Sequence, residues 1–374
     1  MERDTRSAWL MTLAQGLLRL LLLAGCLYGL NALAHRLGQP AGADARLRVV
    51  LFINGTLGDK SFFDAAARGL RQATQTLPLH GRVVEGGGDP TRWQAALADL
   101  ADSGDYDVIV AGTFTMAPAI EDLARRYPAL RFIVFDAQVD YARCACPNVY
   151  SMRFRQNEGA YLAGYLAARL AQDGAPGLPG ARPGGGLGAV GGMQLPVIED
   201  FLLGFQAGAQ AAVPGIAMQV QYANAFSDPA AGKEIARLQY ARGASLVFHA
   251  AGASGQGVNE AAEEAGRHAI GVDLDQAALY RERHPARAAA IVTSVMKQVD
   301  IGLGRALHLA LEGGLPYGRA ESLGLREGGV RLAPRSQVMD RLAPELAADL
   351  ARQQAAIVAG RIKVPSAFDT KGSP

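Results

Sequence analysis

The sequence has little lysine, little cysteine and no large excess of charge of either sign. Of its 374 residues, 37 are Lys or Arg and 35 are Asp or Glu, giving a formal net charge of +2. A nucleic-acid-binding domain needs a basic stripe that neutralises phosphates, so this balance argues against that class. Only five lysines occur, at positions 60, 233, 297, 363 and 371. A lysine beside a loop is therefore more informative here than one of the many arginines.

Several catalytic signatures are also absent. The sequence has no phosphate loop, no His-Glu-x-x-His zinc helix and no Gly-x-Ser-x-Gly nucleophile turn. A formal dinucleotide fingerprint occurs at residues 186–191, but its glycines span a predicted strand, whereas the motif needs them where a helix begins. His249 and His268 lie in apolar runs and are predicted to be core residues. We therefore assign no catalytic residue, no metal site and no cofactor.

The first cysteine belongs to an N-terminal leader. Arg3 and Arg6 precede a mostly apolar stretch at residues 8–34, the layout of a signal peptide. The string Leu-Ala-Gly-Cys ending at Cys26 looks like a bacterial lipobox, in which that cysteine is lipidated. The alternative is an uncleaved signal anchor, because the apolar run continues past Cys26. Either interpretation places the rest of the chain outside the cytoplasm, tethered to a membrane.

The other two cysteines, Cys144 and Cys146, lie close together in the string RCACPN. In an oxidising compartment they are either joined by a small disulfide or present as two free thiols. A zinc site is not expected, because no further His or Cys stands at the required spacing.

The body of the chain has a regular alternation of elements. It is 49% apolar and contains 45 glycines, which cluster between apolar runs. Strands are expected at 46–54, 82–86, 106–112 and 130–136, joined by helices at 62–76, 90–104 and 116–128. After a long helix and a Gly/Pro-rich loop at 172–186, the alternation resumes, with strands at 187–192, 218–224, 245–252, 268–273 and 288–296. This pattern predicts two doubly wound α/β domains, divided near residues 150–155.

Ligands of such sheets bind at the carboxyl ends of the strands. Three carboxylates, a lysine and several aromatic residues follow the predicted strands, and we expect them to converge if the domains face each other. They are Asp59, Asp136, Asp273, Lys297, Phe62, Phe114 and Phe226. Aromatic rings stack on a flat ligand, contributing about 1–3 kcal/mol each, and carboxylates accept hydrogen bonds from hydroxyl or N–H groups. The alternatives are structural: Asp59 and Asp275 as helix caps, Phe62 and Phe226 as core residues, and Lys297 as a solvated helix start.

Several long motifs resemble one known family in collinear order. They include GDKSFFDAAARGL (58–70), NVYSMRFRQNEGAYLAGYLAA (148–168), VFHAAGASGQGVNEAAEEAG (247–266) and TSVMKQVD (293–300). Over about residues 47–335 the chain resembles the basic membrane protein family of ABC-transporter substrate-binding lipoproteins, of the purine nucleoside receptor A type. The resemblance implies a type I periplasmic-binding-protein fold, in which two lobes joined by a crossed hinge close on a ligand.

The resemblance also implies lobe boundaries and ligand contacts. Residues 1–45 would be leader and tether, 46–152 with about 291–318 lobe 1, 153–290 with about 319–364 lobe 2, and 365–374 a disordered tail. The residues carried over by motif as ligand-binding are Asp59, Ser61, Phe62, Asp136, Phe226, Gly252, Asp273 and Lys297. Phe63 departs from the family pattern, which usually has Asn there, so a polar contact from this loop is in doubt.

The function implied is an extracytoplasmic receptor that captures a purine nucleoside or related purine and delivers it to an ABC permease and its ATPase. The receptor would make and break no bonds. A sensor that signals to a membrane partner through the same cleft stays an alternative. A nucleoside-processing enzyme is disfavoured, because the loop after the first strand has only Asp59 where a metal-binding hydrolase needs several carboxylates.

Overall fold

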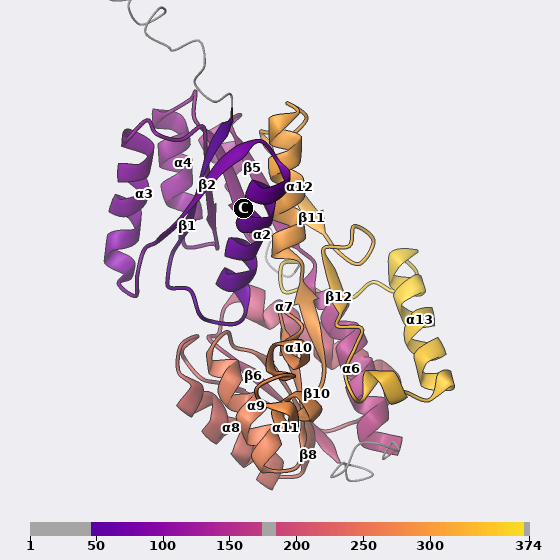
Figure 1. Cartoon of the computed structure of the whole chain (residues 1–374). Coiled ribbons are helices and arrows are strands. Elements are labelled where there is room, and N and C mark those ends of the chain that lie inside the picture. Colours follow the sequence, from indigo (N-terminus) through magenta and orange to yellow (C-terminus); the bar gives the residue numbers. More distant parts are fainter. Residues whose placement is uncertain (1–45, 174–184, 370–374) are drawn as a thin grey trace, which may run out of the picture. The chain divides into compact units, whose positions relative to one another are not determined.

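The structure is a computed structural model that describes residues 46–173 and 185–369. Its described part contains two six-stranded sheets (Figure 1). The first has the order β11-β5-β4-β3-β1-β2, and all of its neighbouring strands are parallel. Its strands are β1 (Leu47–Ile53), β2 (Leu79–Glu85), β3 (Val108–Gly112), β4 (Arg131–Phe135), β5 (Val149–Phe154) and β11 (Arg319–Leu323).

The second sheet has the order β12-β10-β9-β8-β6-β7, and only its β10–β12 pair is antiparallel. Its strands are β6 (Gly186–Gly191), β7 (Met218–Tyr222), β8 (Ala244–Ala250), β9 (His268–Val272), β10 (Ile291–Lys297) and β12 (Val330–Leu332). We call the first sheet with its helices lobe 1 and the second sheet with its helices lobe 2. Strand β6 spans the formal dinucleotide fingerprint, so the predicted failure of that motif is confirmed.

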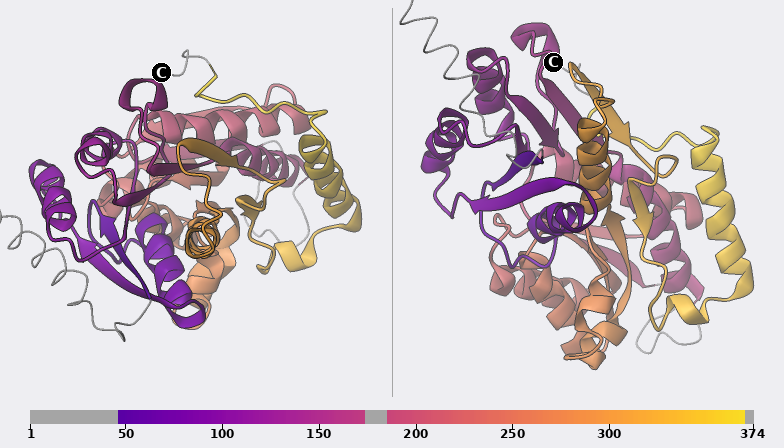
Figure 2. Two further views of the ribbon diagram at one scale, coloured as in Figure 1. Left: turned by 90° about the horizontal axis from the view of Figure 1, so that it is seen from above. Right: turned by 45° about the horizontal axis from the view of Figure 1, so that its top comes forward.

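Helices cover both faces of each sheet (Figures 1 and 2). In lobe 1 the helices are α2 (Phe62–Thr76), α3 (Trp93–Asp102), α4 (Ala117–Arg126), α5 (Tyr141–Cys144) and α12 (Val299–Leu311), with a 3-10 turn at Pro90–Arg92. In lobe 2 they are α6 (Gln156–Asp173), α7 (Pro196–Ala212), α8 (Pro229–Ala241), α9 (Ser254–Glu264), α10 (Gln276–Tyr280), α11 (Pro285–Ala290) and α13 (Pro344–Val358), with a 3-10 turn at Met339–Arg341. No helix within these described ranges is both long and apolar enough to cross a membrane.

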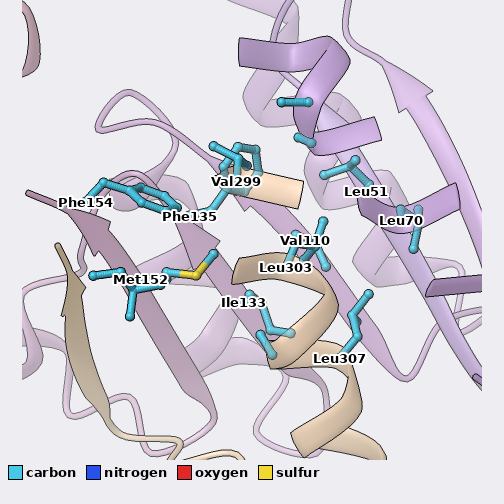
Figure 3. Packing of buried hydrophobic residues seen from close by; sticks show 14 of the residues in the cluster. Leu51, Leu70, Val110, Ile133, Phe135, Met152, Phe154, Val299, Leu303 and Leu307 are labelled. Atoms are coloured by element: carbon cyan, nitrogen blue, oxygen red, sulfur yellow. The ribbon is translucent and has the colours of Figure 1, made fainter. Parts of the chain in front are cut away.

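Strand β1 shows why the sheet needs helices on both faces. Its side chains alternate, and Val49, Leu51 and Ile53 enter one buried cluster while Val50 and Phe52 enter another. The first cluster lies against α2 and α12, and Figure 3 shows part of it. The second cluster lies against α3 and α4. The apolar residues 49–53 of β1 are therefore buried on both sides of the sheet, as parallel sheets require.

Helices α6 and α7 of lobe 2 pack at unusually close range. A Cβ atom added at Gly164 would lie 1.9 Å from the carbonyl oxygen of Phe205, and one added at Gly208 would lie 1.9 Å from that of Tyr161. Each glycine therefore admits the backbone of the opposite helix.

Sheet membership differs from the expected lobe boundaries at two strands. We expected residues 291–297 in lobe 1, but β10 pairs with β9 of lobe 2. We expected residues 319–323 in lobe 2, but β11 pairs with β5 of lobe 1. The chain crosses between the sheets after β5, after β10 and after β11. Each boundary was misplaced by one strand because an apolar run does not reveal which sheet it joins.

The cysteines are paired, and the C-terminal tail is more ordered than expected. Cys144 and Cys146 form a disulfide, one of the two alternatives left open by the sequence. The tail expected to be disordered from residue 365 is instead ordered as far as Asp369, and Ser366 hydrogen-bonds to lobe 2. The leader with Cys26, most of the 172–186 loop and residues 370–374 lie outside the described residues.

Candidate functional site

Three residues that directly follow strands adopt a left-handed backbone conformation. They are Thr113 after β3 (φ 71°), Asp136 after β4 (φ 58°) and Asp273 after β9 (φ 66°). Such a conformation costs a non-glycine residue about 1–3 kcal/mol and tends to occur at functional sites. The turn lets each backbone N–H bond to the neighbouring strand; that of Asp136, for example, donates to Met152 over 2.7 Å. Both lobes therefore use the same device to present a carboxylate at the carboxyl edge of their sheet.

Lys297, the last residue of β10, lies at the centre of the site. Its Nζ is 2.8 Å from Oδ1 of Asp136, and the two side chains are only 3% and 10% exposed. The ammonium also lies over three rings, at 5.3 Å from the centroid of Phe62, 5.9 Å from Phe154 and 5.2 Å from Phe201. Burial raises the pKa of Asp136, and the Lys297 charge opposes that rise. A lysine of lobe 2 thus pairs with a carboxylate of lobe 1, and three aromatic rings lie around the lysine.

A second polar contact joins the lobes beside this pair. The hydroxyl of Ser61, at the start of α2, donates to Oδ2 of Asp273, and both residues are buried. Burial raises the pKa of Asp273 to about 6, while Lys297 and the Ser61 hydroxyl favour its charged form. Ser61 makes no side-chain cap of its own helix, so its hydroxyl is free to reach the other lobe.

Asp59, and not Ser61, caps the N-terminus of α2. Its carboxylate accepts the backbone N–H groups of Ser61, Phe63 and Asp64, at 2.9, 2.9 and 3.2 Å. Burial still raises the pKa of Asp59, because these bonds offset only part of the lost hydration. Its backbone oxygen accepts from Nε2 of Gln256 in lobe 2 over 3.2 Å. Asp59 thus caps α2, as the structural alternative predicted, and its contact with a ligand stays a prediction.

The remaining predicted residues differ in how they are held. Phe63 packs over Gly55, whose added Cβ would lie 2.8 Å from the Phe63 ring. Phe114 is 48% exposed at the end of β3. Phe226 packs against the core of lobe 2 and beside Gly252, which has a φ of 56°. Phe63 therefore packs against the backbone at Gly55 and Phe114 is exposed, and the contact of either ring with a ligand stays a prediction.

Comparison with known proteins identifies the family. Residues 46–367 match the family model Bmp, described as ABC transporter substrate-binding protein PnrA-like. The chain belongs to this family. It is 30% identical to Basic membrane protein A of Borreliella burgdorferi over 291 residues, covering 76% of this chain and 78% of that one. It is 29% identical to the ABC transporter nucleoside-binding protein BmpA of Lactococcus lactis subsp. cremoris, covering 86% of this chain and 90% of that one.

Solved structures agree with this assignment. A solute-binding protein of an ABC transporter system from Aeropyrum pernix K1 superposes with a TM-score of 0.74 and 27% identity, covering 86% of this chain and 94% of that one. A periplasmic ribose ABC transporter protein from Conexibacter woesei has the same fold, with a TM-score of 0.57 at 15% identity. The predicted type I fold is confirmed. This Bmp-family chain is the extracytoplasmic solute-binding receptor of an ABC importer, and such receptors carry a ligand without transforming it.

A cavity of about 760 Å³ opens beside the Bmp-family site. Its lining includes Phe114 and Asp136 of lobe 1, Asp200 of lobe 2 and Ser366 of the C-terminal tail. Asp200 was not among the predicted site residues, because acidic side chains are usually exposed. It lies in the second turn of α7, directly before the buried Phe201. No group of three or more His, Cys, Asp or Glu within 46–173 and 185–369 could hold a metal ion.

Proposed function

We propose that this receptor captures a purine nucleoside, or a related purine, between its two lobes and delivers it to its permease. The observation that carries the proposal is the buried Lys297–Asp136 pair that bridges the lobes among aromatic rings. A nucleoside combines a flat ring with a ribose that both donates and accepts hydrogen bonds. The site offers rings for the first, and carboxylates and an ammonium for the second.

The polar groups match the two sides of a ribose hydroxyl. Asp136 and Asp273 accept hydrogen bonds, and Lys297 donates them, so adjacent hydroxyls would find both kinds of partner. Hydrogen bonds to charged groups contribute about 1.5–3 kcal/mol each, and base stacking about 1–3 kcal/mol. One stacking contact and two such bonds together contribute about 4–9 kcal/mol before the cost of association. The nucleoside-binding name of the Lactococcus relative supports the same ligand class.

Closure of the lobes supports delivery by the same contacts. Lys297–Asp136 and Ser61–Asp273 each join a residue of lobe 1 to one of lobe 2. A ligand that bonds to these residues would bind both lobes at once and so favour the closed arrangement. A permease that docks both lobes would then distinguish loaded from empty receptor by the distance between its docking points.

The deciding experiment is isothermal titration of the purified receptor with inosine, adenosine, guanosine and the free bases. We expect at least one nucleoside to bind with micromolar or tighter affinity. Asp136→Asn should weaken that binding about tenfold or more, because it removes the charge that faces Lys297. Asp340→Asn, at an exposed 3-10 turn of lobe 2, is the matched control and should leave affinity unchanged. No heat and no thermal shift with any of these compounds would overturn the ligand assignment while leaving the fold intact.

We also propose that the N-terminal leader tethers the receptor to the membrane, through a lipid on Cys26 or as an uncleaved anchor. The family is extracytoplasmic, and the tether would keep the receptor close to its permease. Intact-mass measurement of the membrane-extracted protein distinguishes the two forms. A chain beginning at a lipid-modified Cys26 supports lipidation, a chain that keeps residues 1–25 supports the anchor, and a water-soluble chain lacking both overturns the tether.

A further inference from the structure

The C-terminal segment 364–368, which we call the strap, packs against lobe 2 beside the site. Nδ2 of Asn157, in the first turn of α6, donates to the carbonyl oxygens of Val364 and Pro365 over 3.2 and 3.1 Å. The strap also lines the cavity that contains Asp136. The strap is therefore held at the edge of the cavity that Asp136 lines.

The strap fixes one buried carboxylate. Oδ1 of Asp200 accepts from the Ser366 hydroxyl over 2.6 Å and from the Ala367 N–H over 3.0 Å. Its Oδ2 accepts from Nε2 of Gln156 over 2.6 Å. Asp200 is fully buried, so these bonds replace the water that the carboxylate has lost. Two of its bonds come from the strap.

Asp200 lies on the helix that brings an aromatic ring against the central lysine of the site. Burial raises the pKa of Asp200, and the charge of Lys297 is among the influences that oppose this rise. The ring of the next residue, Phe201, lies 5.2 Å from the Lys297 ammonium. Lys297 is therefore paired directly with Asp136 of lobe 1, and Asp200 is a further buried carboxylate that is fixed in the lobe of Lys297.

We propose that Asp200 is a positioning residue of the solute site and that the strap holds it in place. An ammonium paired only with Asp136 would follow that carboxylate whenever the lobes separate or a ligand engages it. A fixed negative charge within lobe 2 keeps Lys297 directed into the cleft with its donor ready for the ligand. The affinity test below rests on the proposed nucleoside function, whereas the stability test does not.

The chain allows a conservative removal of this charge. Asp200→Asn has the same shape and keeps an oxygen for Ser366 and Ala367. Its new amide would face Gln156, whose Oε1 has no hydrogen-bond partner among the described residues. Rotation of the Gln156 amide would then satisfy both groups, so the variant should fold.

The ligand-free test is a double-mutant cycle of unfolding by denaturant with Asp200→Asn, Lys297→Met and both changes together. If the two charges interact, the effect of Asp200→Asn should change sign or shrink when Lys297 is absent. We expect a coupling of about tenfold in the unfolding equilibrium, or 1.4 kcal/mol. Additive effects would overturn the proposal whether or not nucleosides bind.

The second test measures inosine affinity by titration, with Ser366 varied in the otherwise intact chain. We expect Ser366→Ala to weaken binding about threefold to tenfold, and Ser366→Thr, which keeps the hydroxyl, to restore it. Ser103→Ala, which removes an exposed hydroxyl in lobe 1, should leave the affinity unchanged. Unchanged affinity in both Ser366→Ala and Asp200→Asn would refute the positioning role. If the wild-type receptor binds no nucleoside, the proposed ligand fails and the stability cycle alone decides the role of Asp200.

Discussion

Replacing Asp273 by Asn should stabilise the ligand-free receptor at neutral pH. Asp273 is 6% exposed, and burial raises its pKa from 3.8 to about 6. Because the folded-state pKa is the higher one, the folded protein binds this proton more tightly than the unfolded chain. The carboxyl group's contribution to stability is therefore fully present below about pH 4 and is lost as the pH rises through about 6. At 1.36 kcal/mol per pH unit, the difference corresponds to about 3 kcal/mol.

The assay compares denaturant unfolding of the wild type and Asp273→Asn between pH 4 and 7.5. Asn keeps an oxygen that accepts from Ser61 but cannot ionise. We expect nearly equal free energies of unfolding at pH 4 and an advantage for the variant of about 3 kcal/mol at pH 7. The control is Asp275→Asn, because Asp275 caps α10 through Ala278 N–H and Asn caps equally well. That change should be nearly neutral at every pH.

A stability difference between wild type and Asp273→Asn that stays constant from pH 4 to 7.5 would refute this reasoning. It would mean that Asp273 ionises as readily in the folded protein as in the unfolded chain. A pH-dependent difference in Asp275→Asn as well would assign the effect to the whole loop and not to the buried carboxyl group.

Three further changes test packing, charge and stacking. Gly208→Ala should lower the free energy of unfolding by about 2 kcal/mol or more, because its Cβ would overlap the Tyr161 carbonyl. The control is Gly304→Ala in α12, which has open space around it and should be neutral or stabilising in the same denaturant assay. Lys297→Met should lower the free energy of unfolding by about 3–5 kcal/mol, because it leaves Asp136 buried without its partner. Adding Asp136→Asn should recover most of that loss, and no recovery would contradict the pairing. Phe226→Leu should weaken nucleoside binding about tenfold in calorimetry while Phe226→Tyr retains it, and equal affinities would exclude a stacking role.

Much of the lobe architecture follows from local patterns. The run around Leu51 is apolar at every position, which only a sheet buried on both faces accommodates, and α2 begins and ends at the predicted residues. The carboxyl ends of the strands also predicted Asp136, Asp273 and Lys297 as neighbours, and the structure brings them together. Both predictions depend on chain direction and on the periodicity of apolar residues, which can be read directly from a sequence.

The crossings and the strap depend on long-range pairing that local patterns do not encode. Strand β10 was expected in lobe 1, but it pairs with β9 on one side and, on the other, with β12, to which the chain returns only after passing through lobe 1. The tail was expected to be disordered from residue 365, and its order comes from contacts with Asn157 and Asp200, which are far away in the sequence. Asp200 was not predicted, because acidic side chains are usually exposed and its partners in the tail are distant in sequence.

The ligand-free site carries unfavourable features that a solute can relieve. Burial raises the pKa of Asp59, Asp136 and Asp273 together, while Lys297 is the only buried lysine among the described residues. Two of these aspartates also hold left-handed backbone conformations. A solute that brings hydroxyl or N–H donors can add hydrogen bonds to the single ones that Asp136 and Asp273 accept from Lys297 and Ser61. The site therefore favours solutes rich in donors over apolar rings of the same size.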